Sequence, residues 1–243
     1  MTKWYREDLA YIHDVGHADF ALESAPGLLE ILARNGIHDG LVVDLGCGSG
    51  LWARELVEAG YRVLGIDISE AMIELSRAKV PEAEFRVGSL FDTDIPPCCA
   101  VTAISEVLNY LFDEDAGGGL APLFRRVFEA MVAGGVFVFD VLGPGQVPPG
   151  ATAQIFRVGE DWAVFAEREE DAEKETMERR IVGFRNVGDH YRRTDEVHRV
   201  RLYEPSELSS ELRRAGFEVR TMGAYGDYAL GEGHAAFEAR KPA

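Results

Sequence analysis

The strongest constraint on the fold is an alternation of short apolar runs and helically spaced segments over the first 142 residues. Residues 41–45 and 62–66 have the length and apolar content of buried strands, and residues 51–59 between them repeat apolar side chains at helical spacing before Gly60. Expected strands at 84–87, 100–104 and 136–141 and expected helices at 69–75 and 120–132 continue the alternation. This pattern predicts an α/β fold with a parallel sheet covered on both faces.

The pattern changes after residue 142. Glycine and proline cluster at 143–150, and residues 154–203 alternate charged with β-favouring side chains. We therefore expect an antiparallel β-insert there. A helix at 205–215 and two closing strands at 217–221 and 235–239 complete the expected elements.

The amino-acid composition narrows the classes of molecule with which the protein could interact. The 243 residues hold 42 acidic and 25 basic side chains, a formal charge of −17, which disfavours nucleic acid and anionic membranes as partners. No run of 18 apolar residues is present, and the N-terminus lacks the apolar centre of a signal peptide. Three cysteines, two of them adjacent, do not form a disulfide framework. We expect a cytoplasmic protein, and the charge does not name its substrate.

A glycine-rich loop connects the first expected strand to its helix. Gly46, Gly48 and Gly50 would let the backbone turn sharply and approach a ligand closely. Asp67 lies 21 positions after Gly46, at the end of the second expected strand. A carboxylate in that place can accept both ribose hydroxyls of an adenosine, so the order of elements predicts a nucleotide site.

The loop's spacing distinguishes between nucleotides. A dinucleotide fingerprint needs a third glycine at the position of Leu51. Asp44 places a negative charge near the loop, which suits a cation better than a pyrophosphate. S-adenosylmethionine carries a sulfonium, an ammonium and an adenosine, so Asp44 would favour its positive end, directly or through water, while Asp67 holds the ribose.

With Asp44, Gly46, Gly48, Gly50 and Asp67 in place, residues 41–68 resemble the class I S-adenosylmethionine-dependent methyltransferases. The resemblance implies a Rossmann-like, doubly wound, seven-stranded and mostly parallel sheet, whose last strand, 234–240, is antiparallel. It covers 36–142 and, less closely, 205–240. We expect an N-terminal helical cap at 1–35, a cofactor-binding domain at 36–142 and 205–243, and a β-insert at 143–204 that resembles the substrate lids of small-molecule methyltransferases.

The resemblance also implies further cofactor neighbours. Cys47 lies inside the loop, and Ile68 follows the ribose-binding acid. The remaining positions are the adenine side after strand three, the methionine side after strand four, and an N-terminal helix over the cofactor. These positions correspond to Ser89 and Leu90, to Ser105, and to Tyr11 and Phe20.

The methyl acceptor is left open as a nitrogen, oxygen or carbon nucleophile. Candidate pocket residues are Asn109, Tyr110, Tyr191 and His198. His198 could serve as a base for a hydroxyl acceptor or have a purely structural role, and no residue is assigned as catalytic. Arg199 and Arg201 would share a strand face, where they either receive an acidic substrate or pair with nearby acids.

The sequence also offers three other interpretations: a zinc site, an oxidoreductase and a non-catalytic binding module. His13 and His17 have the spacing of a helical zinc site, but no third ligand is evident, so we expect no metal. A nicotinamide-dependent oxidoreductase would use the same strand–loop–helix unit. A non-catalytic S-adenosylmethionine-binding module would bind the cofactor without turnover. The sequence does not determine the oligomeric state.

Overall fold

A computed structural model describes residues 4–112 and 119–243. Residues 1–3, in the expected cap, and 113–118, in the expected cofactor-binding domain, lie outside the described residues. The first half contains α1 (Glu7–Gly16), α2 (Ala18–Arg34), β1 (Leu41–Leu45), α3 (Leu51–Glu58), β2 (Arg62–Asp67), α4 (Glu70–Lys79), β3 (Glu84–Val87), β4 (Cys98–Ala103), a 3-10 turn (Val107–Asn109), α5 (Ala121–Ala130) and β5 (Met131–Leu142). The second half contains β6 (Ala153–Val158), β7 (Trp162–Asp171), β8 (Thr176–Val187), β9 (His190–Arg201), α6 (Pro205–Arg214), β10 (Glu218–Met222), β11 (Ala224–Tyr225), β12 (Tyr228–Ala229) and β13 (His234–Arg240).

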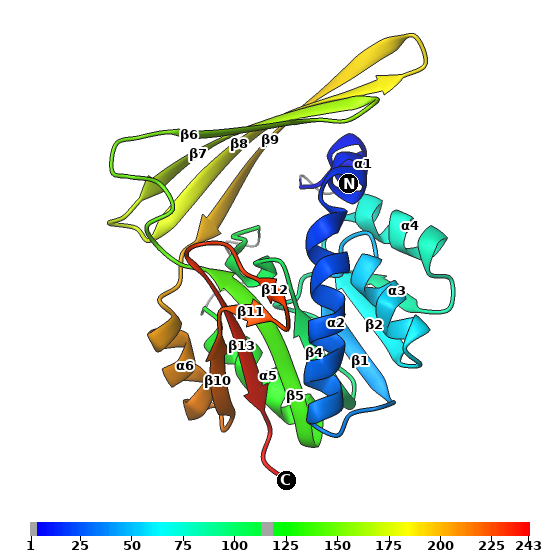
Figure 1. Ribbon diagram of the computed structural model, residues 1–243, viewed down its shortest axis with the longest axis vertical. Coiled ribbons are helices and arrows are strands. Elements are labelled where there is room, and N and C mark those ends of the chain that lie inside the picture. The colour runs from blue at the N-terminus through cyan, green and yellow to red at the C-terminus, as the bar shows by residue number, and fades with distance from the viewer. Residues whose placement is uncertain (1–3, 113–118) are drawn as a thin grey trace.

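The main sheet has seven strands in the order β10-β13-β5-β4-β1-β2-β3 (Figure 1). Strands β1 to β5 pair in parallel, whereas β13 is antiparallel to both β5 and β10. The chain starts in the middle of the sheet, moves to one edge and returns to build the other side. This confirms the predicted doubly wound fold and its antiparallel last strand.

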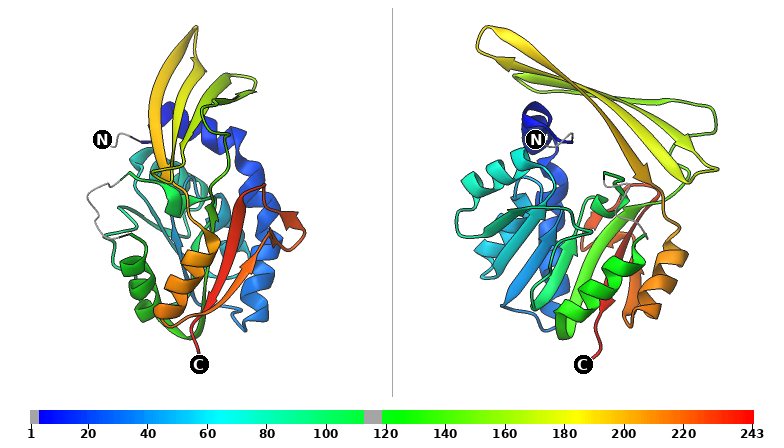
Figure 2. Two further views of the ribbon diagram at one scale, coloured as in Figure 1. Left: turned by 90° about the vertical axis from the view of Figure 1, so that its left-hand side faces the viewer. Right: turned by 180° about the vertical axis from the view of Figure 1, so that it is seen from behind.

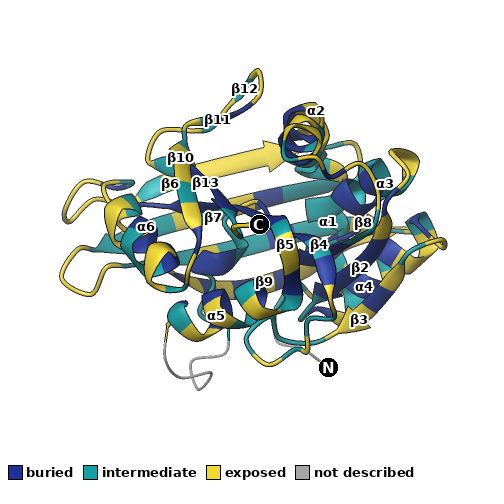
Figure 3. Ribbon diagram, turned by 90° about the horizontal axis from the view of Figure 1, so that it is seen from below, coloured by how far each residue is buried: buried dark blue, intermediate teal, exposed yellow. Residues whose placement is uncertain are grey.

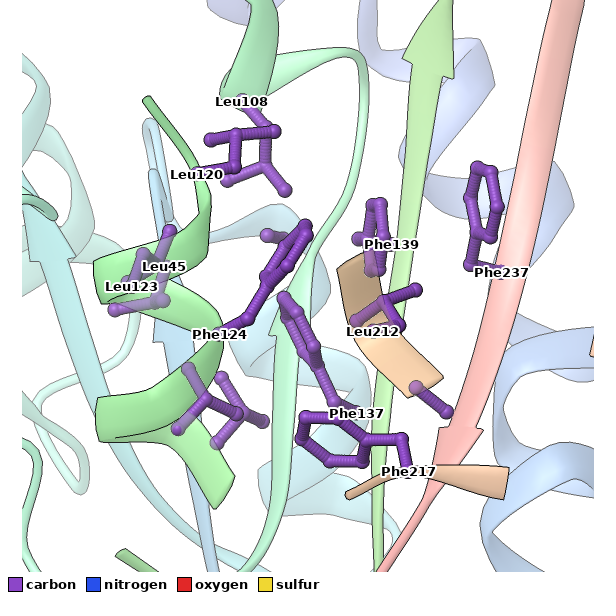
Figure 4. Packing of buried hydrophobic residues seen from close by; sticks show 14 of the residues in the cluster. Leu45, Leu108, Leu120, Leu123, Phe124, Phe137, Phe139, Leu212, Phe217 and Phe237 are labelled. Carbon is purple, nitrogen blue, oxygen red and sulfur yellow. The ribbon is translucent and has the colours of Figure 1, made fainter. Parts of the chain in front are cut away.

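Helices cover both faces of this sheet, and each face has its own apolar core. Helices α5 and α6 pack on one face, and α2, α3 and α4 on the other. Figure 3 shows that central strands such as β2 and β4 are largely buried, whereas α5 and α6 have exposed outward faces. On the α5 face, aromatic rings pack between β5, β13 and α5 (Figure 4). The ring centroids of Phe139 and Phe237 are 4.8 Å apart, and those of Phe124 and Phe139 are 5.8 Å apart.

A second, four-stranded antiparallel sheet, β6-β7-β8-β9, leaves the main sheet after β5 and returns before α6. It extends across the carboxyl ends of the parallel strands, with α1 beneath it (Figure 2). Leu9 and Ile12 of α1 pack against Val164 of β7. The predicted antiparallel insert is therefore confirmed, and α1 separates part of it from the main sheet.

Element boundaries follow local signals in most places. Ser69 caps α4 by accepting a hydrogen bond from the Met72 N–H (3.2 Å), as expected. The helix predicted at 120–132 instead ends at Ala130, and β5 begins at Met131, which pairs with Cys98. Among the described residues, no helix combines the length and the apolar character needed to span a bilayer.

Candidate functional site

A cavity of about 520 Å³ lies between the carboxyl ends of the main-sheet strands and the inner face of the β6–β9 sheet. Its floor comes from the loops that follow β1, β2, β3 and β4. Its roof comes from α1, the start of α2 and strands β6, β7 and β8. Doubly wound sheets bind their ligands at this end, so the topology places the cavity where a ligand is expected.

The glycine loop forms one wall of the cavity. Gly46 has a φ of 71° and Gly48 a φ of 53°, which side chains with a Cβ rarely adopt. A Cβ at Gly46 would lie 1.9 Å from Val107 Cγ2, so this glycine is needed for packing. A Cβ at Gly48 would meet nothing within 4 Å. Gly48 therefore exposes bare backbone to the cavity.

Asp67 holds this loop from the end of β2. Its Oδ2 accepts a hydrogen bond from the Gly48 N–H (2.9 Å), and its Oδ1 accepts one from the Ser69 N–H (2.8 Å). Burial raises the pKa of Asp67 to about 6, although both hydrogen bonds lower it. Each carboxylate oxygen keeps a lone pair, so Asp67 can still accept two hydroxyl groups.

Asp44 lies behind this wall. It is 1% exposed, and its Oδ1 accepts a hydrogen bond from the Thr102 hydroxyl (2.7 Å), which itself accepts one from Trp52 Nε1 (3.2 Å). Burial is the main cause that raises the pKa of Asp44 to about 7, and the nearby charge of Asp67 adds to it. Asp44 therefore does not line the cavity itself.

A strained turn follows β4. Ser105 and Glu106 have φ values of 66° and 53°, unusual for residues other than glycine. Asp140 stabilises this turn because its two oxygens accept the N–H groups of Ser105 (2.8 Å) and Glu106 (2.7 Å). Tyr225 donates a further hydrogen bond to Asp140 (3.0 Å). The turn directs Glu106 toward Arg179 of β8, with which it makes two hydrogen bonds of 2.7 and 2.9 Å.

Aromatic and imidazole rings line the part of the cavity near α1. The hydroxyls of Tyr5 and Tyr110 are hydrogen-bonded at 2.8 Å. His13 packs edge-on against Tyr5, with ring centroids 5.2 Å apart, and stacks on His17 at 5.3 Å. Burial and His17 lower the pKa of His13 to about 3, so its imidazole is neutral at physiological pH. Within 4–112 and 119–243, no three His, Cys, Asp or Glu side chains cluster as metal ligands.

Comparison with known proteins identifies the family. Residues 42–135 match the methyltransferase domain family. A Geobacillus sp. (strain WCH70) protein described as a methyltransferase is 28% identical over 195 residues, 73% of this chain and 74% of its own. A Bacillus subtilis (strain 168) protein with the same description is 28% identical over 198 residues, 76% of each chain. The chain is a class I S-adenosylmethionine-dependent methyltransferase. The predicted enzyme class and its cofactor, S-adenosylmethionine, are therefore confirmed, and the oxidoreductase and non-catalytic alternatives are set aside.

The fold of the methyltransferase also matches solved structures over its whole length. A methyltransferase from Clostridium acetobutylicum ATCC 824 aligns with a TM-score of 0.81 at 19% identity, covering 96% of this chain and 98% of that one. The alignment includes most of the β6–β9 region, so the arrangement of two sheets is shared and not peculiar to this chain.

Most of the cofactor positions expected from sequence line the cavity of the methyltransferase. Those that do are Gly46, Gly48, Asp67, Ile68, Ser89, Leu90, Ser105 and Phe20. Asp44 and Cys47 lie behind the loop, and burial raises the pKa of the Cys47 thiol well above its usual value. Gly50 is the N-cap residue just before α3, where a Cβ would lie 2.9 Å from Ser76 Cβ. Tyr11 lies outside the cavity because its hydroxyl bonds Asp161 (2.9 Å) and Arg185 covers its ring.

Of the four candidate substrate residues, only Tyr110 lines the cavity. Asn109 is fully buried and bonds the backbone instead, donating to Leu142 O (2.8 Å) and Arg201 O (2.5 Å) and accepting from Leu142 N (3.0 Å). His198 is buried against Glu196 (2.8 Å), consistent with a structural role. Tyr191 is 65% exposed at the far end of the β8–β9 hairpin.

The arginines of the insert lie on both faces of its sheet. Arg199 and Arg201 pair with Glu178 (3.3 Å) and Glu175 (3.2 Å) on the exposed side, which corresponds to the second of the two alternatives. The cavity is instead lined by Arg157, Arg168 and Arg179. Strand periodicity alone could not identify the inner face, because both faces of β7 and β8 carry charged residues.

Proposed function

We propose that this methyltransferase transfers the methyl group of S-adenosylmethionine to a nitrogen, oxygen or carbon nucleophile on a small molecule held under the β6–β9 sheet. The observation that carries the proposal is the juxtaposition of Gly48 and Asp67. An open glycine backbone and a buried carboxylate with free lone pairs share one wall of the cavity. That arrangement suits an adenosine whose ribose meets the carboxylate.

The remaining wall residues suit the rest of the cofactor. Ser89 and Leu90 follow β3 on the side where the adenine would lie, and Ser105 follows β4 on the methionine side. Asp67, whose pKa is about 6, is mostly ionised at neutral pH and gives this end of the cavity a negative field, which favours a cation. Asp44, whose pKa is about 7, adds to this field in its ionised form. When bound, S-adenosylmethionine supplies a methyl group already activated by a positively charged sulfur.

The chain's contribution to rate is positioning, exclusion of water and control of protons. Orientation of two reactants contributes up to about 7–11 kcal/mol to such a step. Tyr5, Tyr110 and His13 form a hydrogen-bonding wall in which the imidazole is neutral and can accept a proton or a hydrogen bond. A neutral amine acceptor needs only to be aimed there, whereas a hydroxyl acceptor benefits from a base.

Two relatives support a small-molecule acceptor. A trans-aconitate 2-methyltransferase from Paracidovorax citrulli is 30% identical over 156 residues, 62% of this chain and 54% of its own. A dTDP-4-amino-2,3,4,6-tetradeoxy-D-glucose N,N-dimethyltransferase from Saccharopolyspora spinosa is 27% identical over 142 residues, 56% of this chain and 55% of its own. A net charge of −17 disfavours nucleic acid as the acceptor. All three cysteines are free, which suits a reducing compartment, so we place the reaction in the cytoplasm.

Calorimetric titration with S-adenosylmethionine tests the role of Asp67. We expect Asp67→Ala to weaken binding about 100-fold, because a charged acceptor of two hydrogen bonds is lost. The matched control is Asp94→Ala, which removes an exposed carboxylate from the loop before β4 and should bind as the wild type does. Near-ultraviolet circular dichroism verifies that both variants are folded. Unchanged affinity in folded Asp67→Ala would contradict the assignment.

A further inference from the structure

The inner face of the β6–β9 sheet carries a row of basic side chains. Strand register places Arg168 of β7 directly opposite Arg179 of β8, which lies opposite His198 of β9. Arg168 and Arg179 both line the cavity. Like charges directly opposite on neighbouring strands destabilise a sheet. The pairing of Arg168 with Arg179 therefore calls for a compensating interaction.

Only one of the two arginines has an acid partner. Glu106 uses both of its oxygens on Arg179, at 2.7 and 2.9 Å. In the part of the chain that the structure describes, Arg168 has no hydrogen bond and no ion pair within 4.0 Å. Burial and the charge of Arg179 both lower the pKa of Arg168, while Glu106 acts on it only at longer range.

The acids that the structure describes near Arg168 on β7 do not pair with it either. Glu167 and Glu169 flank Arg168 along β7, so their side chains point to the opposite face of the sheet. Glu170 shares the face of Arg168, but its carboxylate accepts the N–H groups of three loop residues, Gly145 (2.8 Å), Gln146 (2.7 Å) and Val147 (3.0 Å). In a chain with 42 acidic and 25 basic residues, a guanidinium that no acid pairs with among residues 4–112 and 119–243 points to an external anion.

The residues around Arg168 indicate the chemical character of the rest of the ligand. The next row along the inner face is apolar and consists of Ile155, Ala166 and Ile181, all of which line the cavity. A guanidinium beside an apolar wall suits a molecule with an apolar body and one anionic group. The planar guanidinium matches the oxygens of a carboxylate or phosphate.

We propose that Arg168 binds the anionic group of the methyl acceptor, so that the substrate is a small molecule bearing a carboxylate or a phosphate. This inference rests on the proposed function, since it concerns the acceptor end of the same cavity. Arg179, held by Glu106, would flank the anion and raise the local positive potential.

The test uses calorimetry on protein saturated with S-adenosylhomocysteine, titrated with inorganic phosphate and, separately, with acetate at constant ionic strength. We expect saturable binding of at least one anion to the wild type and an affinity at least tenfold lower in Arg168→Gln. Tighter binding of phosphate would assign a phosphate-bearing acceptor, and tighter binding of acetate a carboxylate. Arg180→Gln is the matched control, because the neighbouring Arg180 faces the opposite side, paired with Glu178, and should bind as the wild type does.

Several outcomes would overturn the proposal. These are no saturable binding of either anion to the wild type, equal binding by wild type and Arg168→Gln, or equal losses in Arg168→Gln and Arg180→Gln. A melting temperature several degrees lower in Arg168→Gln would also contradict it, because removal of a like-charged neighbour should not destabilise the sheet. Failure of the wild type to bind S-adenosylhomocysteine when it is saturated before these titrations would instead contradict the proposed function.

Discussion

At the scale of single residues, the site depends on buried carboxylates at the ends of strands. Asp44, Asp67 and Asp140 end or nearly end β1, β2 and β5, and burial raises their pKa values to about 7, 6 and 6. Each acid is held by hydrogen bonds from loop or neighbouring-strand groups. Asp67 lines the cavity itself, whereas Asp44 and Asp140 are buried behind the loops that line it.

The raised pKa of Asp67 predicts that cofactor affinity depends on pH. Ribose hydroxyls donate to the ionised carboxylate, and a folded-state pKa of about 6 means that this form is lost as the pH falls through 6. We expect the affinity for S-adenosylmethionine to be constant above pH 7 and to fall toward a slope of about tenfold per pH unit below pH 6. Calorimetry between pH 5 and 8 measures it.

Asp67→Asn is the control for this pH profile, because the amide does not titrate. It should bind more weakly than the wild type at pH 7.5 but with a flat profile. A profile that keeps the wild-type slope in Asp67→Asn would transfer the effect to another group, such as Asp44 or Asp140, whose pKa values lie in the same range.

Residues of the donor site were predictable to the extent that their signal is local. Gly46, Gly48 and Asp67 are close in sequence, so spacing alone brings them together. Asp140 was not predicted, because its function depends on the turn at 105–106 and on Tyr225, which come from distant parts of the chain. Arg168 was not predicted as a cavity residue for a similar reason, since its proposed role depends on the cross-strand pairing with Arg179.

At the scale of elements, α2 packs closely against β11 because Gly27 has no side chain. A Cβ on Gly27 would lie 2.2 Å from the Tyr225 carbonyl carbon and 2.5 Å from the Gly226 nitrogen, both backbone atoms. Tyr225 in turn donates to Asp140, which stabilises the turn at 105–106. The packing of this helix is therefore connected to the floor of the cavity.

Gly27→Ala should separate α2 from β11. Overpacking against backbone costs about 1–3 kcal/mol, and better helix propensity offsets up to about 1 kcal/mol, so we expect net destabilisation measurable by urea unfolding. Gly223→Ala, where a Cβ would meet nothing within 4 Å, is the matched control and should change stability by less than about 0.5 kcal/mol. Equal stabilities for the two variants would contradict this account of the packing.

Hydrophobic periodicity predicted the type of most elements but not every boundary. The helix expected to reach residue 132 stops at Ala130, because Met131 pairs with Cys98 and Lys241 donates to the carbonyls of Phe128 and Met131 (2.7 Å each). These partners lie 33 and about 110 positions away in the chain, beyond the reach of any local pattern.

At the scale of the whole molecule, α1 connects the two sheets. One side of this helix contributes Leu9, Ile12 and His13 to the cavity. Another side presents Asp8, which pairs with Arg192 and with Arg185 (3.4 Å) of the β8–β9 hairpin and is only 13% exposed. The cavity roof thus depends on ion pairs between α1 and the insert.

Loss of Asp8 should loosen this roof. We expect Asp8→Ala to lower the free energy of unfolding by about 2 kcal/mol, because it leaves two arginines without this partner, and to weaken S-adenosylmethionine binding. Hydrogen exchange of residues 7–16 should increase. Glu7→Ala removes a 73% exposed acid that pairs with the same Arg192, so it should cost at most about 1 kcal/mol and leave exchange unchanged. Equal effects of the two substitutions would contradict a specific role for Asp8.

The hydrogen bonds of the Asn109 side chain have a consequence for how the acceptor specificity of such enzymes could change. Its amide joins Leu142, the last residue of β5, to Arg201, the last residue of β9, and the Tyr203 N–H also bonds Leu142 O (3.1 Å). The insert, residues 143–201, thus leaves and rejoins the main sheet at neighbouring points that these hydrogen bonds connect. If the proposed function holds, we expect substitutions within it to change which acceptor binds while the register of β5 stays fixed.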